Sequence, residues 1–251
     1  MRVLFYQSMI EAIRLFRNFA YIFWTLVTPL AFYILYTKVF LTDVDNPKMW
    51  QAYFLMSMTM FGMMGGSIIA FGVRIVSERQ LGWSKLLQIV PIPGITLFMA
   101  KIIGQTIVHA IVIVIMFLGG FFINGIELTL SQWFACGVWI LLGTLPFLAL
   151  GTIIGTIKKA DTATGIANLL YFPLAILGGM WTPMQFLPET IQKIGKLLPS
   201  YHYGNGAWQV VQGGAPEMEN ILFLTSYFLI FMLISTYRRK KKSLSNVEYI
   251  S

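Results

Sequence analysis

The sequence predicts an all-α integral membrane protein with six transmembrane helices. Hydrophobic residues make up 57% of the 251 residues and charged residues only 11%, whereas a soluble domain carries about 25% charged residues. Six segments are also long enough to cross the hydrocarbon core of a bilayer, which takes about 20 mostly apolar residues per helix. The whole chain, residues 1–251, is therefore expected to form one transmembrane domain.

The spans follow one another along the chain with connections of uneven length. The first predicted span is too long to be a removed signal peptide, and it matches a small-residue cleavage site too poorly. The predicted spans cover about 19–41, 52–73, 102–123, 133–157, 163–182 and 220–237.

The positions of the basic residues predict the orientation of the spans. Four of the eighteen Lys and Arg, namely Lys38, Lys48, Lys193 and Lys196, fall in segments on one side of the membrane, and the rest fall in segments on the other side. Because basic residues concentrate on the cytoplasmic side, both termini are expected in the cytoplasm of a multi-pass protein of the plasma (cytoplasmic) membrane. The net charge of +8 is then explained by topology and by anionic inner-leaflet lipid, and no nucleic-acid partner is expected.

The segment before the first span has the pattern of an amphipathic helix. Gln7, Glu11, Arg14 and Asn18 recur at helical spacing, with apolar residues on the other side. Next to a span, such a helix is expected to lie along the inner membrane surface. A plain cytoplasmic extension of the first span is the alternative.

The connection between the second and third spans, 74–101, is the most polar part of the first half of the chain. Polar residues alternate there with apolar ones such as Leu86 at helical spacing, and Pro91 stops the pattern because proline lacks an N–H group. We expect a short cytoplasmic helix that Glu78 and Arg79 begin, outside the spans. A loop with amphipathic packing is the alternative.

The outer segment between the fifth and sixth spans is long for a connector. Pro188 can open a helix, and an apolar stripe follows as far as Pro199, which is expected to end it. Tyr203 and Trp208 then belong to residue types that are enriched at membrane interfaces. The sequence predicts a short interfacial helix and a partly re-entrant segment before the last span.

The chain lacks the motifs of the common catalytic sites. The phosphate-binding pattern G-x-x-x-x-G-K-[ST] is absent, so no ATP hydrolysis and no cofactor are expected in this chain. Neither G-x-S-x-G nor H-E-x-x-H occurs. With Cys136 as the single cysteine, and only two histidines, neither a disulfide framework nor a metal site is expected.

His109 is an ionisable residue within the third span. Such a residue is a candidate for a transport path, but a lone neutral imidazole bonded to a neighbouring helix is the alternative. Proton-driven transport is disfavoured because Glu127, Asp161 and Glu189 all fall at span ends or in loops.

Two stretches on opposite sides of the membrane follow a pattern known from one family. The inner stretch carries Glu78, Arg79, Gly82, Leu86, Leu87, Pro91 and Lys101. The outer stretch carries Gly178, Gly179, Met180, Trp181, Pro183, Leu187, Pro188, Leu198, Pro199, Tyr203, Gly213 and Gly214. Together and in this order, the two stretches resemble the permease subunits of the ABC-2 class of ATP-binding-cassette exporters. Trp83, where the family often has threonine, and Ala100, where glycine usually precedes the lysine, depart from the family pattern.

The resemblance implies a transporter of two permease subunits, identical or homologous, and two ATPase subunits on separate chains that bind ATP and Mg²⁺. The inner stretch would be the coupling helix that docks into the ATPase, and the outer stretch would contain an outer gate. The coupling residues would be Glu78, Arg79, Gly82, Trp83, Leu86 and Pro91. The candidate gate residues are Trp181, Pro183, Pro188, Pro199 and Tyr203.

The expected function is outward transport of amphipathic or apolar cargo, such as a drug, an antimicrobial peptide or a lipid-like molecule, by alternating access. Twenty Phe and fourteen Met suit an uncharged path, although Met is also an ordinary core-filling residue. Export of a lipid-linked saccharide or haem is one alternative. A membrane scaffold or sensor subunit without transport is the other.

Overall fold

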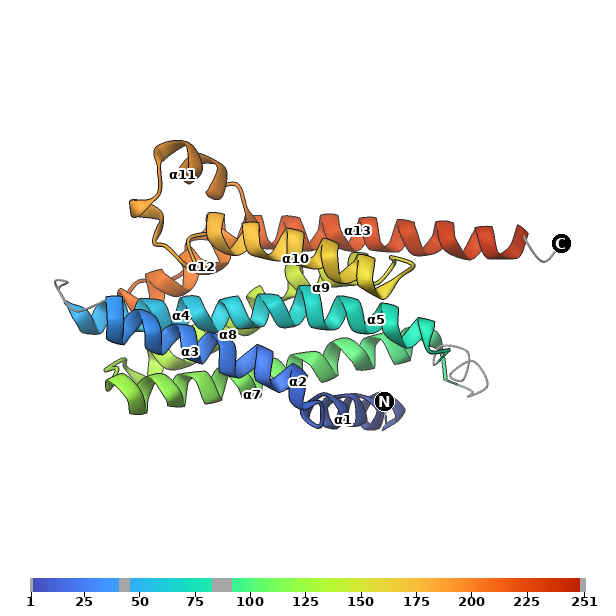
Figure 1. The fold of residues 1–251 in the computed structure, drawn as a ribbon, viewed down its shortest axis with the longest axis horizontal. Helices are drawn as coiled ribbons and strands as arrows, with labels where there is room; N and C mark the ends of the chain where they lie inside the picture. Colours follow the sequence, from blue (N-terminus) through green and yellow to red (C-terminus); the bar gives the residue numbers. More distant parts are fainter. Residues whose placement is uncertain (1, 41–45, 83–91, 249–251) are drawn as a thin grey trace.

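The structure of the chain is a computed structural model that describes residues 2–40, 46–82 and 92–248 (Figure 1). Three of the predicted coupling residues, Trp83, Leu86 and Pro91, lie outside the described residues. The described part is all helical, with these elements in chain order: α1 (Arg2–Phe16), α2 (Phe19–Ile22), the π-helical η1 (Phe23–Val27), α3 (Thr28–Leu35), the π-helical η2 (Tyr36–Phe40), α4 (Pro47–Gly65), the π-helical η3 (Gly66–Ala70), α5 (Phe71–Gln80), α7 (Gly94–Asn124), α8 (Leu130–Gly143), α9 (Leu145–Ile154), α10 (Ala160–Leu177), the 3₁₀ turn η4 (Met184–Phe186), α11 (Glu189–Gly195), α12 (Pro199–Val211) and α13 (Met218–Glu248).

The prediction of six membrane-spanning helices is confirmed for the described residues. Several ends differ from the predicted ones, most of all in the second span, which runs without a break to Gln80. Its start is fixed by Asn46, whose side chain accepts a hydrogen bond from the N–H of Met49, with Pro47 in the first turn. The six spans are Phe19–Val39, Pro47–Gln80, Gly94–Asn124, Leu130–Ile154, Ala160–Leu177 and Met218–Lys240.

The second span forms the centre of the bundle. α4 packs against α3, α7 and α12, and the continuation through η3 and α5 packs against α9 and α10. Its methionines fill the interior of the single chain, which is the ordinary packing role of this flexible side chain. The fully buried ones, each with 0% of its surface exposed, are Met56, Met58, Met60, Met63 and Met64.

The N-terminal helix α1 is a separate element that packs along the first half of α7. It is not a plain continuation of the first span, because Asn18 begins a new helix by accepting a hydrogen bond from the N–H of Tyr21. Ala12 and Leu15 are buried against the bundle. The opposite side of α1 is apolar and exposed, with Phe5, Tyr6, Met9, Ile10 and Ile13 on the surface.

The outer segment is more regular than the sequence predicts. Pro188 precedes α11 as expected, but this helix ends at Gly195, and Pro199 opens a further helix, α12. Proline fits the first turn of a helix because its missing N–H group has no partner there in any case. α12 packs against α4, α8 and α13, and Figure 1 shows it with α11 at the end of the bundle opposite the C-terminal end of α13. Its depth relative to the membrane stays a prediction.

Candidate functional site

Glu78 and Arg79 lie in the last turn of α5, so the expectation that they begin a separate helix outside the spans is wrong. No proline or capping side chain interrupts the helix before Gln80, and the second span therefore continues through both residues. The helix dipole at this position disfavours a carboxylate rather than stabilising it. Glu78 is nevertheless buried, with 6% of its surface exposed, and neighbouring cations supply the compensation.

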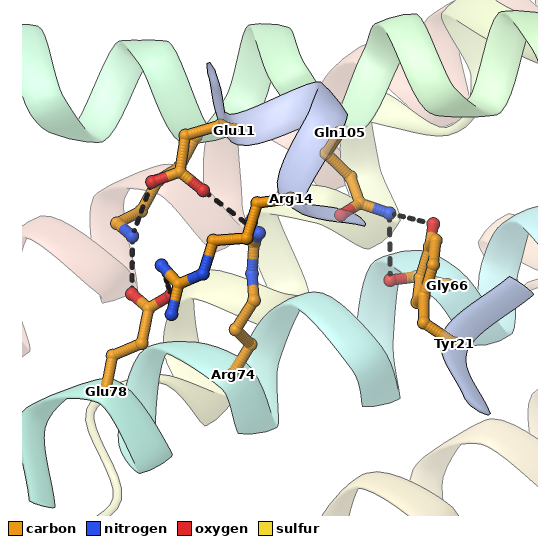
Figure 2. Close-up of polar contacts among 8 residues, drawn as sticks. Glu11, Arg14, Tyr21, Gly66, Arg74, Glu78 and Gln105 are labelled. Atoms are coloured by element: carbon orange, nitrogen blue, oxygen red, sulfur yellow. Dashed lines mark hydrogen bonds and ion pairs between the residues drawn. The ribbon is translucent and has the colours of Figure 1, made fainter. Parts of the chain in front are cut away.

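Glu78 belongs to an ionic cluster that joins three helices and in which only Arg14 is exposed (Figure 2). We call Glu11, Arg14, Arg74, Glu78 and Lys101 the ionic cluster. Nη1 of Arg14 lies 2.9 Å from Oε1 of Glu78, and Nη1 of Arg74 lies 3.1 Å from Oε2 of Glu11. Lys101 pairs with both carboxylates, at 3.1 Å from Oε1 of Glu11 and in direct contact with Glu78. The cluster fixes α1 and α7 to the C-terminal end of the second span.

The spacing of Glu11 and Arg14 predicts that they share one face of a helix at the membrane surface. No pattern in the sequence indicates that this face joins Arg74, Glu78 and Lys101 in one cluster. In the structure that face turns toward α5 and α7, because Lys101 and Glu78 offer partners there. Buried charges are stable only when they are paired, and removing one partner typically costs about 3–5 kcal/mol.

Arg79 connects the second span to the end of the fourth. Its Nη1 donates a hydrogen bond of 2.8 Å to the carbonyl oxygen of Gly155, and its Nη2 donates to that of Ile157. Both carbonyls follow the last turn of α9, where backbone acceptors have no partner within the helix. Gln80 extends the connection by accepting a hydrogen bond of 3.3 Å from the N–H of Ala160, the first residue of α10.

Gly82 ends the turn after α5 and is the last residue described before position 92. Its φ of +74° lies in the left-handed region, which side-chain-bearing residues adopt at a cost of about 1–2 kcal/mol. A Cβ atom placed on Gly82 would meet no atom within 4 Å among the described residues. The backbone conformation therefore favours glycine here, and crowding among the described residues does not.

His109 is completely buried in the third span and is held by polar partners. The amide nitrogen of Gln105 lies 2.9 Å from Nε2 of His109 and 2.7 Å from the hydroxyl of Tyr21. A neutral His109 that accepts at Nε2 carries its proton on Nδ1, and Nδ1 has no hydrogen-bond partner in the described part of the chain. The contacts are those of an imidazole bonded within the bundle, while a direct role of His109 in transport stays a hypothesis.

Two π-helical segments flank this polar group. η3 begins at Gly66, whose carbonyl oxygen lies 3.4 Å from the amide nitrogen of Gln105, and η1 follows directly after α2, which carries Tyr21 (Figure 2). A Cβ atom on Gly66 would lie 2.8 Å from Nε2 of His109. Short π-helical segments often mark functional sites in helices, so the first and second spans have a candidate functional point at the same polar contact.

The candidate gate residues do not gather in one cluster. Trp181 packs among rings of the first, second and fifth spans, at 5.5 Å from Phe32 and 5.6 Å from Phe61 between ring centroids. Tyr203 is fully buried on α12 and donates a hydrogen bond of 2.8 Å to the carbonyl of Ile140 in the fourth span. Pro188 and Pro199 begin α11 and α12. Four of the five therefore have structural roles. Trp181 packs among the rings of the spans, and the other three position α11 and α12.

Pro183, the fifth candidate, lines a pocket of about 300 Å³ between α4, η4 and α12. The pocket is lined by aromatic and carboxamide side chains, and none of its lining residues is charged. The aromatic residues are Trp50, Tyr53, Tyr201 and Trp208, and the amides are Asn46, Gln185, Asn205, Gln209 and Gln212. Such a surface suits a neutral or amphipathic molecule.

His202 on α12 fixes the end of α11 and the start of α13, a role that no pattern in the sequence predicts. Its Nδ1 lies 2.9 Å from the amide oxygen of Asn220 at the start of α13, and its Nε2 lies 2.8 Å from the carbonyl oxygen of Lys196 after α11. Its ring also stacks on Phe223, with the centroids 3.9 Å apart. In the described parts of the chain, no group of three or more His, Cys, Asp and Glu residues is placed to hold a metal ion.

Comparison with known proteins gives a consistent family assignment. The sequence profile described as ABC-2 family transporter protein matches residues 36–237. The chain is 47% identical over 242 residues to the putative transport permease YvfS of Bacillus subtilis, covering 96% of this chain and 99% of that protein. It is 27% identical over 187 residues to the inner membrane transport permease YhhJ of Escherichia coli, covering 67% of this chain and 47% of YhhJ.

Proposed function

The chain belongs to the ABC-2 transporter family, and from this premise we propose that it is the permease subunit of an exporter driven by a separate ATPase. ATP and Mg²⁺ would bind to two copies of that ATPase, since this sequence lacks the phosphate-binding loop. A second permease, identical or homologous, would complete the path across the membrane.

One observation carries the proposal: the inner end of the second span is tied to the helices around it. Glu78 contacts α1 and α7 through Arg14 and Lys101. Arg79 contacts the connection between the fourth and fifth spans through Gly155. A displacement applied to the chain just after Gln80 would therefore reach α1, the third span and the connection between the fourth and fifth spans through charged and hydrogen-bonded contacts. This arrangement supports a coupling role for the segment that begins at Glu78.

The pocket beside Pro183 supports the proposed cargo. Its aromatic rings and amides, without a charged lining residue, suit an amphipathic or apolar molecule. The same surface favours a second candidate, because aromatic rings and amides also bind neutral sugar rings through apolar contact and hydrogen bonds. Export of a lipid-linked saccharide is therefore the second candidate for the cargo.

The experiment compares purified permease with and without its partner ATPase in proteoliposomes. The permease alone should hydrolyse ATP at background rate, and the complex should show hydrolysis that responds to cargo and is accompanied by efflux. Robust hydrolysis by the lone chain would contradict the proposal. A complex that never moves any cargo, although it assembles, would favour the scaffold or sensor alternative. Efflux of a labelled lipid-linked saccharide in preference to drugs and peptides would support the second candidate.

A further inference from the structure

A polar pocket of about 650 Å³ lies between α1 and the first turns of α7, beside the ionic cluster. Its polar lining consists of three cations, two amides and one carboxylate. These residues are Arg14, Arg17, Lys101, Gln7, Asn18 and Glu11. The lining therefore has a surplus of positive charge and two amides that can donate hydrogen bonds, which is the composition of an anion site.

The ionic cluster does not neutralise this surplus. It contains the three cations Arg14, Arg74 and Lys101 against the carboxylates Glu11 and Glu78. In addition, Nε and Nη2 of Arg74 are buried without a hydrogen-bond partner in the described part of the chain. Arg17 adds a further positive charge and forms no ion pair within residues 2–40, 46–82 and 92–248. A nearby anion would compensate this excess of charge.

The apolar surroundings of the pocket indicate an amphiphile rather than a soluble anion. Ile10, Ile13 and Leu97 also line it, and Ile10 and Ile13 belong to the exposed apolar side of α1. On the far flank of α1, a second, almost entirely apolar groove of about 610 Å³ runs between α1 and α7 past Ile103 and Ile107. A ligand with an anionic head and long acyl chains could use the cationic pocket and the apolar side together.

We propose that this pocket binds the phosphate group of an anionic phospholipid, with Arg17 and Arg14 as the principal ligands and the acyl chains along Ile10 and Ile13. Basic pockets between transmembrane helices at the membrane surface are suited to lipid headgroups. The bound lipid stabilises α1 against α7 and thereby supports the ionic cluster. The site is independent of the proposed cargo and ATPase, and its test measures no transport.

The experiment is native mass spectrometry of the full chain, released from micelles that contain phosphatidylglycerol and phosphatidylcholine together. The chain should retain phosphatidylglycerol in preference to phosphatidylcholine. Arg17→Gln should lower this retention about fivefold, because one basic contact to an anionic lipid contributes about 1 kcal/mol. Arg2→Gln is the matched control, since Arg2 is exposed on the same helix but does not line the pocket. Its retention should equal that of the unmodified chain.

A second measurement separates the lipid from a free anion and checks folding. Melting temperatures are recorded in neutral detergent with inorganic phosphate or with chloride at matched ionic strength, and then with added phosphatidylglycerol. Stabilisation by the lipid alone, reduced in Arg17→Gln and kept in Arg2→Gln, supports the proposal. Equal stabilisation by inorganic phosphate, or equal loss of retention in both variants, would overturn it. Arg17→Gln should melt like the unmodified chain in neutral detergent alone, because the Arg17 side chain is exposed.

Discussion

The guanidinium of Arg79 donates a hydrogen bond of 2.8 Å to the carbonyl oxygen of Gly155 and thereby joins the end of the second span to the end of the fourth. Gly155 is itself in contact with the second span, since a Cβ atom there would lie 2.9 Å from a methyl carbon of Ile75. The two helices approach closely at this point, and Arg79 satisfies backbone acceptors that the close approach hides from water.

Removing the Arg79 guanidinium should destabilise the protein and weaken coupling. In Arg79→Ala, the carbonyls of Gly155 and Ile157 lose their donor, and an unsatisfied buried acceptor costs about 1–3 kcal/mol. The melting temperature in detergent should fall, and cargo-stimulated hydrolysis by the complex should fall with it. Arg238→Ala is the control, because Arg238 is exposed on the last span. Equal melting temperatures for both variants would show that the Arg79 contacts contribute nothing.

Glu78→Lys should reduce the amount of folded protein in the membrane. A third cation would then face Arg14 and Lys101 in a buried place, and breaking a buried ion pair costs about 3–5 kcal/mol. The measurement is membrane abundance by quantitative blotting, with Glu127→Lys as the control, since the Glu127 side chain is 76% exposed. Normal abundance of Glu78→Lys with abolished export would instead indicate that Glu78 acts only at a partner surface.

Two substitutions at Gly82 distinguish the effect of backbone strain from the effect of blocking a partner surface. Asn accepts left-handed backbone conformations better than most residues, so Gly82→Asn should fold and couple nearly normally. Gly82→Trp should also reach the membrane, because no atom of the described residues lies within 4 Å of the added Cβ. It should nevertheless lose most ATPase stimulation if a partner surface approaches here. Full stimulation of the complex by Gly82→Trp would contradict the proposed docking segment.

Gly66→Ala should destabilise the centre of the bundle. The added methyl group would lie 2.8 Å from Nε2 of His109, and overpacking of this kind typically costs about 1–3 kcal/mol. Adding His109→Ala to this variant should partly restore the melting temperature, because the smaller side chain makes room for the methyl group at position 66. Gly165→Ala is the control, because open space surrounds this helical glycine and alanine is favoured over glycine in a helix by about 1 kcal/mol. A Gly66→Ala protein as stable as Gly165→Ala would refute the close contact.

Cysteine labelling tests the predicted orientation of the spans. Lys193→Cys on α11 should react with an impermeant thiol reagent in intact cells, whereas Lys240→Cys at the end of the sixth span should react only after the membrane is opened. The single native thiol, Cys136, is fully buried and should give little background. External labelling at position 240 would reverse the topology and place the Glu78 segment on the wrong side for an ATPase.

The sequence by itself determined the class of fold, because membrane spans depend on local composition. The six apolar stretches, the helix after Pro188 and the separate N-terminal helix required no knowledge of distant contacts. The resemblance at Glu78, Arg79 and Gly82 led to the same family as the comparisons.

Only the tertiary structure decided how the charged residues are used. From the sequence, Glu78 is expected to be a polar residue outside a span. In the structure its carboxylate pairs with Arg14 and Lys101, which lie far from it in the sequence. The charged side of α1 turned inward for the same reason, since in an apolar environment a paired charge is more stable inside the bundle than facing hydrocarbon. Periodicity locates a helical face, but the partner that this face meets depends on how the helices pack.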